Sequence, residues 1–232
     1  MIKIKSILPE KLYSSLLDFY NSLFTGYAIK TYSQEGEDLI LRKVFGRKNN
    51  GFYIDIGAHH PKRFSNTFFF YKKGWKGINI EARPGSKILF DKIRPRDIIL
   101  DFAISSEPKE LTYYMFNEPA LNGFSTQNVE NLKDSKEYKI IKEIKLNTQR
   151  LDTVLTQYLT PTQNIDFMSI DVEGLDYDVL ISNNWNLFKP KIIVIEDPNY
   201  DFKNGSQISN FLEKYDYKLF AKTFNSCFYS IS

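Results

Sequence analysis

The chain has 232 residues, which is long enough for one α/β domain with a full hydrophobic core and short for two domains. Hydrophobic residues make up 42% of the chain and charged residues 25%, which is the composition of an ordinary soluble globular protein. A formal net charge of +3, without a basic stripe, argues against a nucleic-acid-binding protein.

An amphipathic helix is the first predicted element, over residues 9–24. Apolar residues such as Leu12 and Leu16 recur along it at helical spacing. Because its polar face is not strongly basic, we expect the helix to pack on the domain or on a partner subunit rather than on a membrane. Residues 1–50 are therefore interpreted as a helical extension packed on a core of residues 51–232, with a homo-oligomer through this helix as one use of it.

The amino terminus carries no recognisable targeting signal. Polar residues follow Lys3 and Lys5 and interrupt any apolar h-region, so we expect no signal peptide. No apolar run approaches the ~20 residues that span a bilayer. The single cysteine, Cys227, excludes internal disulfides and a thiolate metal cluster, which fits a reducing compartment. The sequence thus predicts a cytoplasmic protein without a transmembrane segment.

Strands and helices alternate along most of the remaining chain, after a polar segment at residues 32–38 and a helix that it caps. Short apolar runs predict strands, and apolar residues at helical spacing predict the helices between them. The predicted core strands are residues 52–57, 76–81, 97–101, 165–171 and 191–197, and the predicted helices are residues 66–73, 86–93, 151–158, 175–181 and 207–215. Residues 217–221 and 227–231 are predicted to form an antiparallel edge. The alternation predicts a parallel sheet with right-handed crossovers.

The region between the third and fourth core strands departs from this pattern. Residues 110–116 and 141–146 are predicted as strands, and the polar stretch 117–139 between them as a lid or substrate loop. Long connections without regular structure in compact domains tend to be functional or disordered. Four aromatic residues of this region are candidates for stacking on a sugar: Tyr113, Tyr114, Phe116 and Phe124.

Every predicted core strand ends in an acid. The carboxyl ends of parallel strands meet at one rim of the sheet, so these acids should converge on one crevice. Carboxylates this close repel one another, so we expect a ligand with several hydrogen-bond donors to compensate. The acids are Asp55, Glu81, Asp101, Asp171, Glu196 and Asp197.

Glu81 follows the glycine turn at Gly57 by roughly the twenty residues that separate glycine and ribose-binding acid in nucleotide-binding folds. The stretch from Gly57 to Pro61 has one glycine where a dinucleotide fingerprint has three, so it does not provide for close approach of a pyrophosphate. A ligand with a ribose but no diphosphate fits better.

Eight motifs occur in order across most of the chain: 33–38, 53–61, 65–67, 74–81, 101–105, 151–152, 170–174 and 195–197. Together they resemble the FkbM family of S-adenosylmethionine-dependent methyltransferases. The resemblance implies a three-layer, Rossmann-like class I methyltransferase fold. Its sheet would have seven strands, mostly parallel, with an antiparallel last strand.

The resemblance also implies a set of contacts to S-adenosylmethionine. The turn after the first core strand would hold the methionine part, the end of the second strand the ribose, and the end of the third strand the adenine. The residues are Asp55, Gly57 and Ala58 for the methionine part, Glu81 for the ribose hydroxyls, Asp101 and Phe102 for the adenine, and Gln34 and His59 for the amino-acid end. His59 stands where the family has a small polar residue.

Members of the family resemble O-methyltransferases that act on hydroxyls of sugars or natural products. Such a transfer needs an in-line approach and a group that accepts the hydroxyl proton. The candidates are Asp171, Glu173 and His60. The alternatives are structural, since acids also serve at helix starts and histidines as hydrogen-bonded core residues. Asp171 and either Glu196 or Asp197, with Glu173 as a further ligand, could instead bind magnesium, although carboxylates also bind polar substrates directly. The metal set without Glu173 is Asp171, Glu196 and Asp197.

We therefore expect an S-adenosylmethionine-dependent O-methyltransferase acting on a hydroxyl of a sugar or sugar-derived acceptor, a precursor of a surface glycan or natural product. Its partner would be a small-molecule or glycan substrate and not a nucleic acid. One alternative is an NAD-binding sugar-nucleotide enzyme, against which the missing glycines count. Another is a non-catalytic binding subunit that keeps the methyltransferase fold.

Overall fold

The computed structural model describes residues 9–24, 26–160 and 162–231. The chain divides into two compact units, residues 1–31 and residues 32–232. The first unit contains α1 (Glu10–Phe24), which has no buried side chain. Apolar side chains along this helix, including those of Phe19 and Leu23, are exposed. Because it buries no side chain, α1 gains little stability from contacts within its own unit, and isolated helices of this length are marginal in water.

A seven-stranded sheet forms the core of the second unit. In spatial order its strands are β3 (Ile98–Leu100), β2 (Lys76–Ile80), β1 (Phe52–Ile56), β7 (Phe167–Ile170), β8 (Ile192–Glu196), β10 (Ser226–Ile231) and β9 (Tyr217–Lys222). The pairs from β3 to β8 are parallel, and β10 is antiparallel to both of its neighbours. This confirms the predicted seven-stranded, mostly parallel sheet with an antiparallel last strand.

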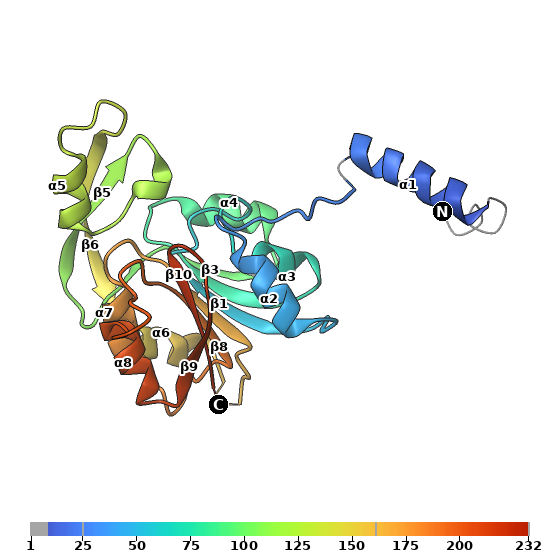
Figure 1. Ribbon diagram of the computed structural model, residues 1–232. Helices are drawn as coiled ribbons and strands as arrows, with labels where there is room; N and C mark the ends of the chain where they lie inside the picture. The colour runs from blue at the N-terminus through green and yellow to red at the C-terminus, as the bar shows by residue number, and fades with distance from the viewer. Residues whose placement is uncertain (1–8, 25, 161, 232) are drawn as a thin grey trace. The chain divides into compact units, whose positions relative to one another are not determined.

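Helices cover both faces of this sheet (Figure 1). On one face, α6 (Leu151–Tyr158), α7 (Asp176–Ile181) and α8 (Gln207–Glu213) bury apolar side chains against Ile54 and Ile56. On the other face, α2 (Glu37–Phe45) and α3 (Phe68–Lys72) pack with Tyr53, and α4 (Ser86–Ile93) covers Ile99 through Phe90. Successive residues of β1 thus point to opposite faces, and those from Tyr53 to Ile56 are buried, as expected for a central parallel strand. The predicted three-layer Rossmann-like fold is confirmed.

A small second sheet is inserted between β3 and α6. Its order is β4 (Ala103–Ile104), β6 (Ile140–Gln149) and β5 (Glu110–Phe116). The stretch predicted as a loop, 117–139, contains the 3-10 helix η1 (Pro119–Leu121) and α5 (Thr126–Leu132). Both begin with a side-chain cap, since Glu118 accepts from the backbone N–H of Ala120 and Ser125 accepts from that of Asn128. These short helices are specified by caps and not by a long apolar repeat.

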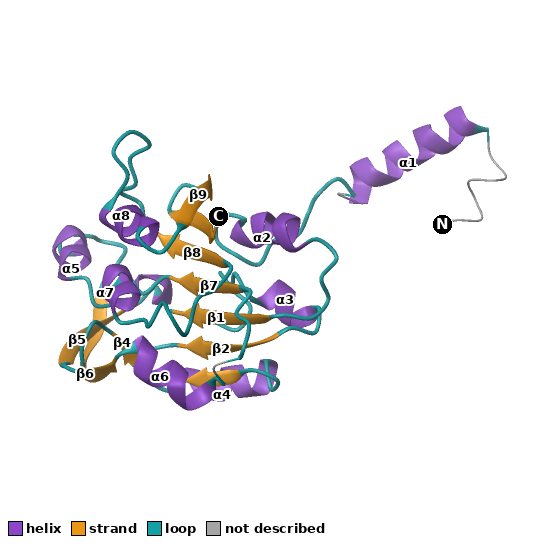
Figure 2. Cartoon of the chain, turned by 90° about the horizontal axis from the view of Figure 1, so that it is seen from below, coloured by secondary structure: helices purple, strands orange, loops and turns teal. Residues whose placement is uncertain are grey.

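The carboxyl ends of β1, β2, β7 and β8 lie at one edge of the large sheet. In Figure 2 their arrowheads point toward the side of the unit that carries β4, β5 and β6. This edge is where open α/β sheets bind ligands. The inserted sheet and its helices therefore stand next to the expected site.

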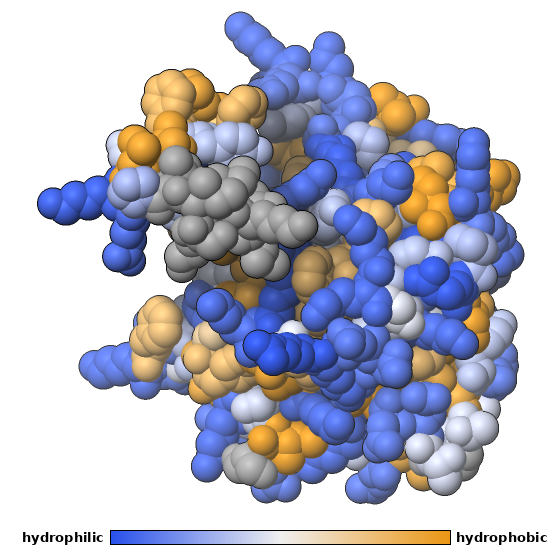
Figure 3. Space-filling view, turned by 90° about the vertical axis from the view of Figure 1, so that its right-hand side faces the viewer, coloured by the Kyte–Doolittle hydropathy of each residue, from blue (hydrophilic) through white to orange (hydrophobic). Residues whose placement is uncertain are grey.

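Surface hydropathy is mixed on the face drawn in Figure 3, where hydrophilic residues predominate and apolar residues form separate patches. Within the residues described, no helix is both long enough and apolar enough to cross a membrane.

Candidate active site

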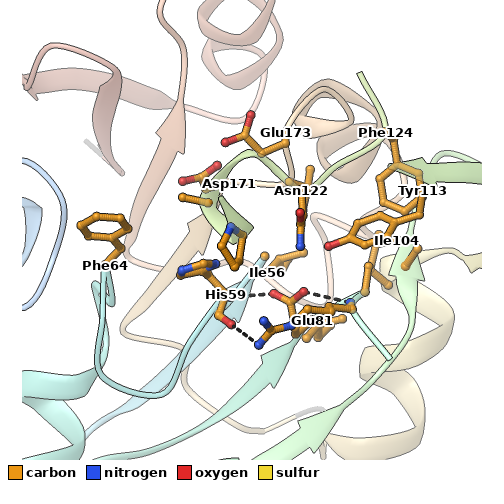
Figure 4. A pocket seen from close by; sticks show the side chains of 18 of the residues that line it. Ile56, His59, Phe64, Glu81, Ile104, Tyr113, Asn122, Phe124, Asp171 and Glu173 are labelled. Atoms are coloured by element: carbon orange, nitrogen blue, oxygen red, sulfur yellow. Dashed lines mark hydrogen bonds between the residues drawn. The ribbon is translucent and has the colours of Figure 1, made fainter. Parts of the chain in front are cut away.

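A cavity of about 750 Å³, including the solvent at its mouth, opens at the carboxyl edge of β1, β2 and β7. Seven of the residues predicted from the sequence to form a site line it: Gln34, Gly57, His59, Glu81, Phe102, Asp171 and Glu173. The inserted region also contributes, with Tyr113 and Phe124 among the lining residues. Figure 4 shows Glu81 and the pair Asp171 and Glu173 as separate groups on the wall of this cavity.

The turn after β1 is held tightly between its neighbouring strands. Gly57 has φ +81°, and a Cβ at this position would lie 1.6 Å from the backbone oxygen of Asp171. The N–H groups of Gly57 and Ala58 donate to the carbonyl of Ile80 at 2.9 and 3.1 Å. Glycine is therefore required for both the backbone conformation and the close approach to the loop after β7. Ala58 is buried behind the turn and does not line the cavity.

Glu81 presents a buried carboxylate at the end of β2. Its Oε2 accepts from the backbone N–H of His59 at 2.6 Å, and its Oε1 accepts from that of Arg83 at 2.9 Å (Figure 4). Burial raises the pKa of this carboxyl, while these two N–H donors act in the opposite direction. A carboxylate oxygen accepts more than one hydrogen bond, so both oxygens can also accept from a pair of ligand hydroxyls.

The segment after β3 places only part of its predicted residues at the cavity. Phe102, Ala103 and Ile104 line it, whereas the exposed Asp101 does not. The hydroxyl-bearing ring of Tyr113 is buried on the same wall, and burial followed by the charge of Glu81 raises its pKa. This wall offers flat apolar surface with one polar tip, which suits an aromatic heterocycle.

Asp55 is turned away from the cavity. Thr67 Oγ1 donates to its Oδ2 at 2.6 Å, and burial raises its pKa. The buried Arg94 donates to Thr67 Oγ1 at 2.9 Å and to Asp97 Oδ2 at 2.8 Å. In this arrangement Asp55 fixes β1 to the start of α3. Its predicted direct contact to a ligand stays a prediction.

Three acids gather around the end of β7. One carboxylate oxygen each from Asp171, Glu173 and Glu196 lies within 4.8 Å of the other two. Asp197, which the sequence grouped with them, is buried elsewhere and accepts from the hydroxyl of Ser206. Glu196, the last residue of β8, joins the group in place of the adjacent Asp197, because successive residues of a strand point to opposite faces.

Burial and mutual repulsion perturb all three acids. The Asp171 side chain keeps solvent-accessible surface toward the cavity, yet protein groups surround it on its other sides, and this burial with the charge of Glu196 raises its pKa well above its usual range. Burial and then Asp171 raise the pKa of Glu173 to about 8. Burial and then Glu173 raise the pKa of Glu196 to about 8. The group would hold protons near neutral pH, or bind a positively charged ligand.

Residues of the inserted region hold Glu173 in position. Its backbone has φ +52°, its carbonyl accepts from the N–H of Phe124 at 3.2 Å, and Asn128 Nδ2 donates to its Oε2 at 3.3 Å. A Cβ on Gly123 would lie 2.3 Å from the Cβ of Glu173. Asn128 and Gly123 therefore fix the position of the acid. No sequence signal marks Asn128, whose role depends on how α5 folds back.

The two histidines after the β1 turn differ in placement. His59 lines the cavity with φ +49°, and burial followed by the charges of Arg63 and Arg83 lowers its pKa to about 4. His60 does not line the cavity, and its Nδ1 accepts from the N–H groups of Lys62 and Arg63, both at 3.0 Å. The neutral His60 ring thus carries its proton on Nε2.

Of the four aromatic candidates of the inserted region, two line the cavity and two do not. Tyr113 and Phe124 face the cavity, with ring centroids 5.0 Å apart. Tyr114 lies outside it, and Phe116 lines a separate surface pocket beside α5. Phe64, which the sequence did not single out, supplies a further aromatic wall. Its signal is local only, a phenylalanine in the loop that follows the histidines.

Comparison with known proteins identifies the family. The profile described as "Methyltransferase FkbM domain" matches residues 55–219. No curated protein matches the sequence significantly. Among solved structures, a TehB-like SAM-dependent methyltransferase from Corynebacterium glutamicum is similar at a TM-score of 0.41, with 9% identity over 96% of this chain and 100% of that one. YjhP from E. coli is similar at a TM-score of 0.36, with 10% identity over 74% of this chain and 52% of that one. The family match covers more than half of the chain, and the protein belongs to the FkbM family of methyltransferases.

Proposed function

We propose that the protein is an S-adenosylmethionine-dependent O-methyltransferase whose acceptor is a hydroxyl of a sugar or sugar-derived molecule. The observation that carries this proposal is the cavity itself, whose lining includes the buried Glu81 carboxylate and the acids Asp171 and Glu173. Family membership supports the methyl transfer. Membership of a methyltransferase family also argues against the alternative of an NAD-binding sugar-nucleotide enzyme.

The proposed cofactor contacts follow the wall of the cavity. Glu81 would accept from the two ribose hydroxyls, because it lines the cavity and both of its oxygens retain acceptor capacity. Phe102 and Tyr113 would enclose the adenine, and Gln34 and His59 would meet the amino-acid end. When bound, S-adenosylmethionine supplies an electrophilic methyl group on a sulfonium that leaves as a neutral thioether.

The remaining residues would act on the acceptor. Phe64 and Phe124 are aromatic faces on which a sugar ring can stack. Glu173 would accept the proton of the attacking hydroxyl after the sulfonium charge of the bound cofactor has lowered its raised pKa and it has lost its own proton. Asp171 would favour the positive charge of the sulfonium. His60 is a weaker candidate for the base, since its Nδ1 already accepts two N–H groups.

A divalent cation is an alternative use of the same acids. The oxygen ligands that magnesium prefers would come from Asp171, Glu173 and Glu196, since Asp197 is bonded to Ser206. Transfer activity that survives EDTA would exclude this use, whereas loss on EDTA and recovery with magnesium would establish it.

The proposals for the oligomeric state and the cellular compartment rest on single features of the chain. The exposed apolar side chains of α1 make this helix our candidate for a homo-oligomer contact. The single, buried Cys227 fits a cytoplasmic protein. Residues 1–50 stay our proposed extension to the core.

Transfer of labelled methyl from S-adenosylmethionine onto a panel of glycan precursors and hydroxylated natural products tests the function. We expect labelled product with at least one sugar-derived acceptor, and loss of transfer in Glu173→Gln with cofactor binding retained. Glu213→Gln, an exposed acid at the end of α8, is the matched control. Cofactor binding that is indifferent to every acceptor, with no product, would favour the non-catalytic binding subunit instead.

A further inference from the structure

The loop between β1 and α3 places His59 and Phe64 on the wall of the cavity and also carries positive charge. Lys62 and Arg63 are exposed on this loop. Arg83, from the turn after β2, lines the cavity and reaches the same loop from the other side. Its guanidinium donates to Ser86 Oγ at 3.3 Å and to the carbonyl of His59 at 3.4 Å, which are both neutral acceptors. Two cations of the loop itself and one from the turn after β2 therefore lie on or beside one short loop.

These positive charges also act on the pKa of His60, a histidine of the loop. Burial lowers the pKa of His60, and the charges of Arg83, Arg63 and Lys62 lower it further. All three cations thus act on a single side chain. Glu118 offsets one of them, because its Oε1 lies 3.0 Å from Nη2 of Arg63. Glu81 offsets a second cation, because its oxygens accept from the backbone N–H groups of His59 and Arg83 and its charge interacts with that of Arg83. A net surplus of about one positive charge is left around the loop, which favours an anion there.

The backbone of the loop is held in an unusual shape. His59 and Phe64 have φ values of +49° and +54°, a region that side-chain-bearing residues rarely adopt. Their rings stack, with centroids 6.0 Å apart and planes at 22°, and the Arg63 guanidinium lies 4.3 Å from the Phe64 centroid. Figure 4 shows His59 and Phe64 facing each other along the cavity. Strain of this kind is retained where the surrounding contacts demand it, often at ligand sites.

We propose that Lys62, Arg63 and Arg83 bind a phosphate group carried by the acceptor. This inference rests on the proposed function, and it narrows the acceptor to a sugar phosphate or a nucleotide-linked sugar. Guanidinium groups bind phosphate oxygens through paired N–H donors, and lysine adds a compact charge. Two guanidinium groups and one ammonium offer more N–H donors than the two oxygens of a single carboxylate can use, whether that of an acidic sugar or that of the cofactor, and this favours a phosphate. The Nε2–H of the neutral His60 ring is a further donor on this loop.

Isothermal titration of the full chain tests the inference without a known acceptor. Pyrophosphate and glucuronate are titrated into protein saturated with S-adenosylhomocysteine, and glucose 1-phosphate and uridine diphosphate glucose then separate the two sources of phosphate. We expect pyrophosphate to bind more tightly than glucuronate. The double variant Lys62→Gln/Arg63→Gln should weaken pyrophosphate binding about tenfold or more, since it removes two positive charges, one of them on a guanidinium with paired N–H donors.

The matched control is Lys76→Gln/Lys218→Gln, which removes the same charge from exposed positions at the starts of β2 and β9. Equal weakening in this control would overturn the site, as would absence of pyrophosphate binding to the wild type. Loss of pyrophosphate binding on saturation with S-adenosylhomocysteine would also overturn it, because the cations would then serve the cofactor carboxylate. Cofactor binding is measured first, so a protein that binds S-adenosylhomocysteine but not pyrophosphate contradicts this inference alone. A protein that does not bind S-adenosylhomocysteine contradicts the proposed function, and titration of the free protein then tests the loop.

Discussion

Replacing Glu173 by glutamine is expected to stabilise the protein above neutral pH. Burial and the neighbouring Asp171 raise the pKa of Glu173 from 4.5 to about 8. Because the folded-state pKa is the higher one, this carboxyl stabilises the fold fully below pH 4.5, and the contribution is lost as the pH rises through about 8. At about 1.36 kcal/mol for each pH unit, the difference amounts to ~5 kcal/mol. That value is a ceiling, since the carboxyl is partly solvent-accessible.

Urea unfolding of the cofactor-free protein at pH 5.5 and pH 9 measures the effect. The free energy of unfolding of the wild type should fall between these two pH values, and Glu173→Gln should remove a large part of that fall. Glu130→Gln, an exposed acid on α5 that pairs with Lys133, is the control and should follow the wild type. An unfolding free energy for Glu173→Gln that is lower than that of the wild type by the same amount at both pH values would refute the reasoning.

Three further predictions concern the cavity. Gly57→Ala should abolish cofactor binding and lower the melting temperature, because its Cβ would meet the backbone oxygen of Asp171 at 1.6 Å; a variant with wild-type affinity for S-adenosylhomocysteine would contradict this. Asn128→Ala should lower kcat by roughly tenfold while the affinity for S-adenosylhomocysteine is unchanged, because a hydrogen bond to a charged group is lost. Gln127→Ala, on the same helix and bonded to Asn131, is the control, and equal loss in both would count against a role for Asn128. Binding of S-adenosylmethionine at pH 7 should release protons, because its sulfonium charge lowers the raised pKa of Glu173, so the titration enthalpy should vary with the buffer's heat of ionisation; an enthalpy that is the same in phosphate and Tris would argue against that charge contact.

The large sheet could be predicted from the sequence because each of its central strands is buried on both faces. Such strands read as apolar runs that end in an acid or a glycine turn, as at residues 52–57 and 165–171. The inserted region could not be predicted in the same way. Its helices are short and amphipathic only in part, and α5 is specified by one cap at Ser125. A search for long apolar repeats assigns such a segment to a loop.

The candidate site was predicted at the level of the sheet edge and less well at single positions. Glu81 and Asp171 reach the cavity because they follow directly on buried strands. Asp101 and Asp197 also end strands, but the direction of their side chains depends on where the chain turns after the last ladder residue. The position of Asn128 beside Glu173 depends on a contact between segments 45 residues apart, for which one sequence gives no signal.

Binding of S-adenosylhomocysteine to the wild type and to Glu81→Gln tests the central claim most directly. Isothermal titration should show one site in the wild type and an affinity lower by about tenfold or more in Glu81→Gln, because the ribose hydroxyls lose a charged acceptor. Glu213→Gln should bind like the wild type. Equal affinity of the wild type and Glu81→Gln, or a folded wild type that binds no S-adenosylhomocysteine, would contradict the assignment of this cavity to the cofactor.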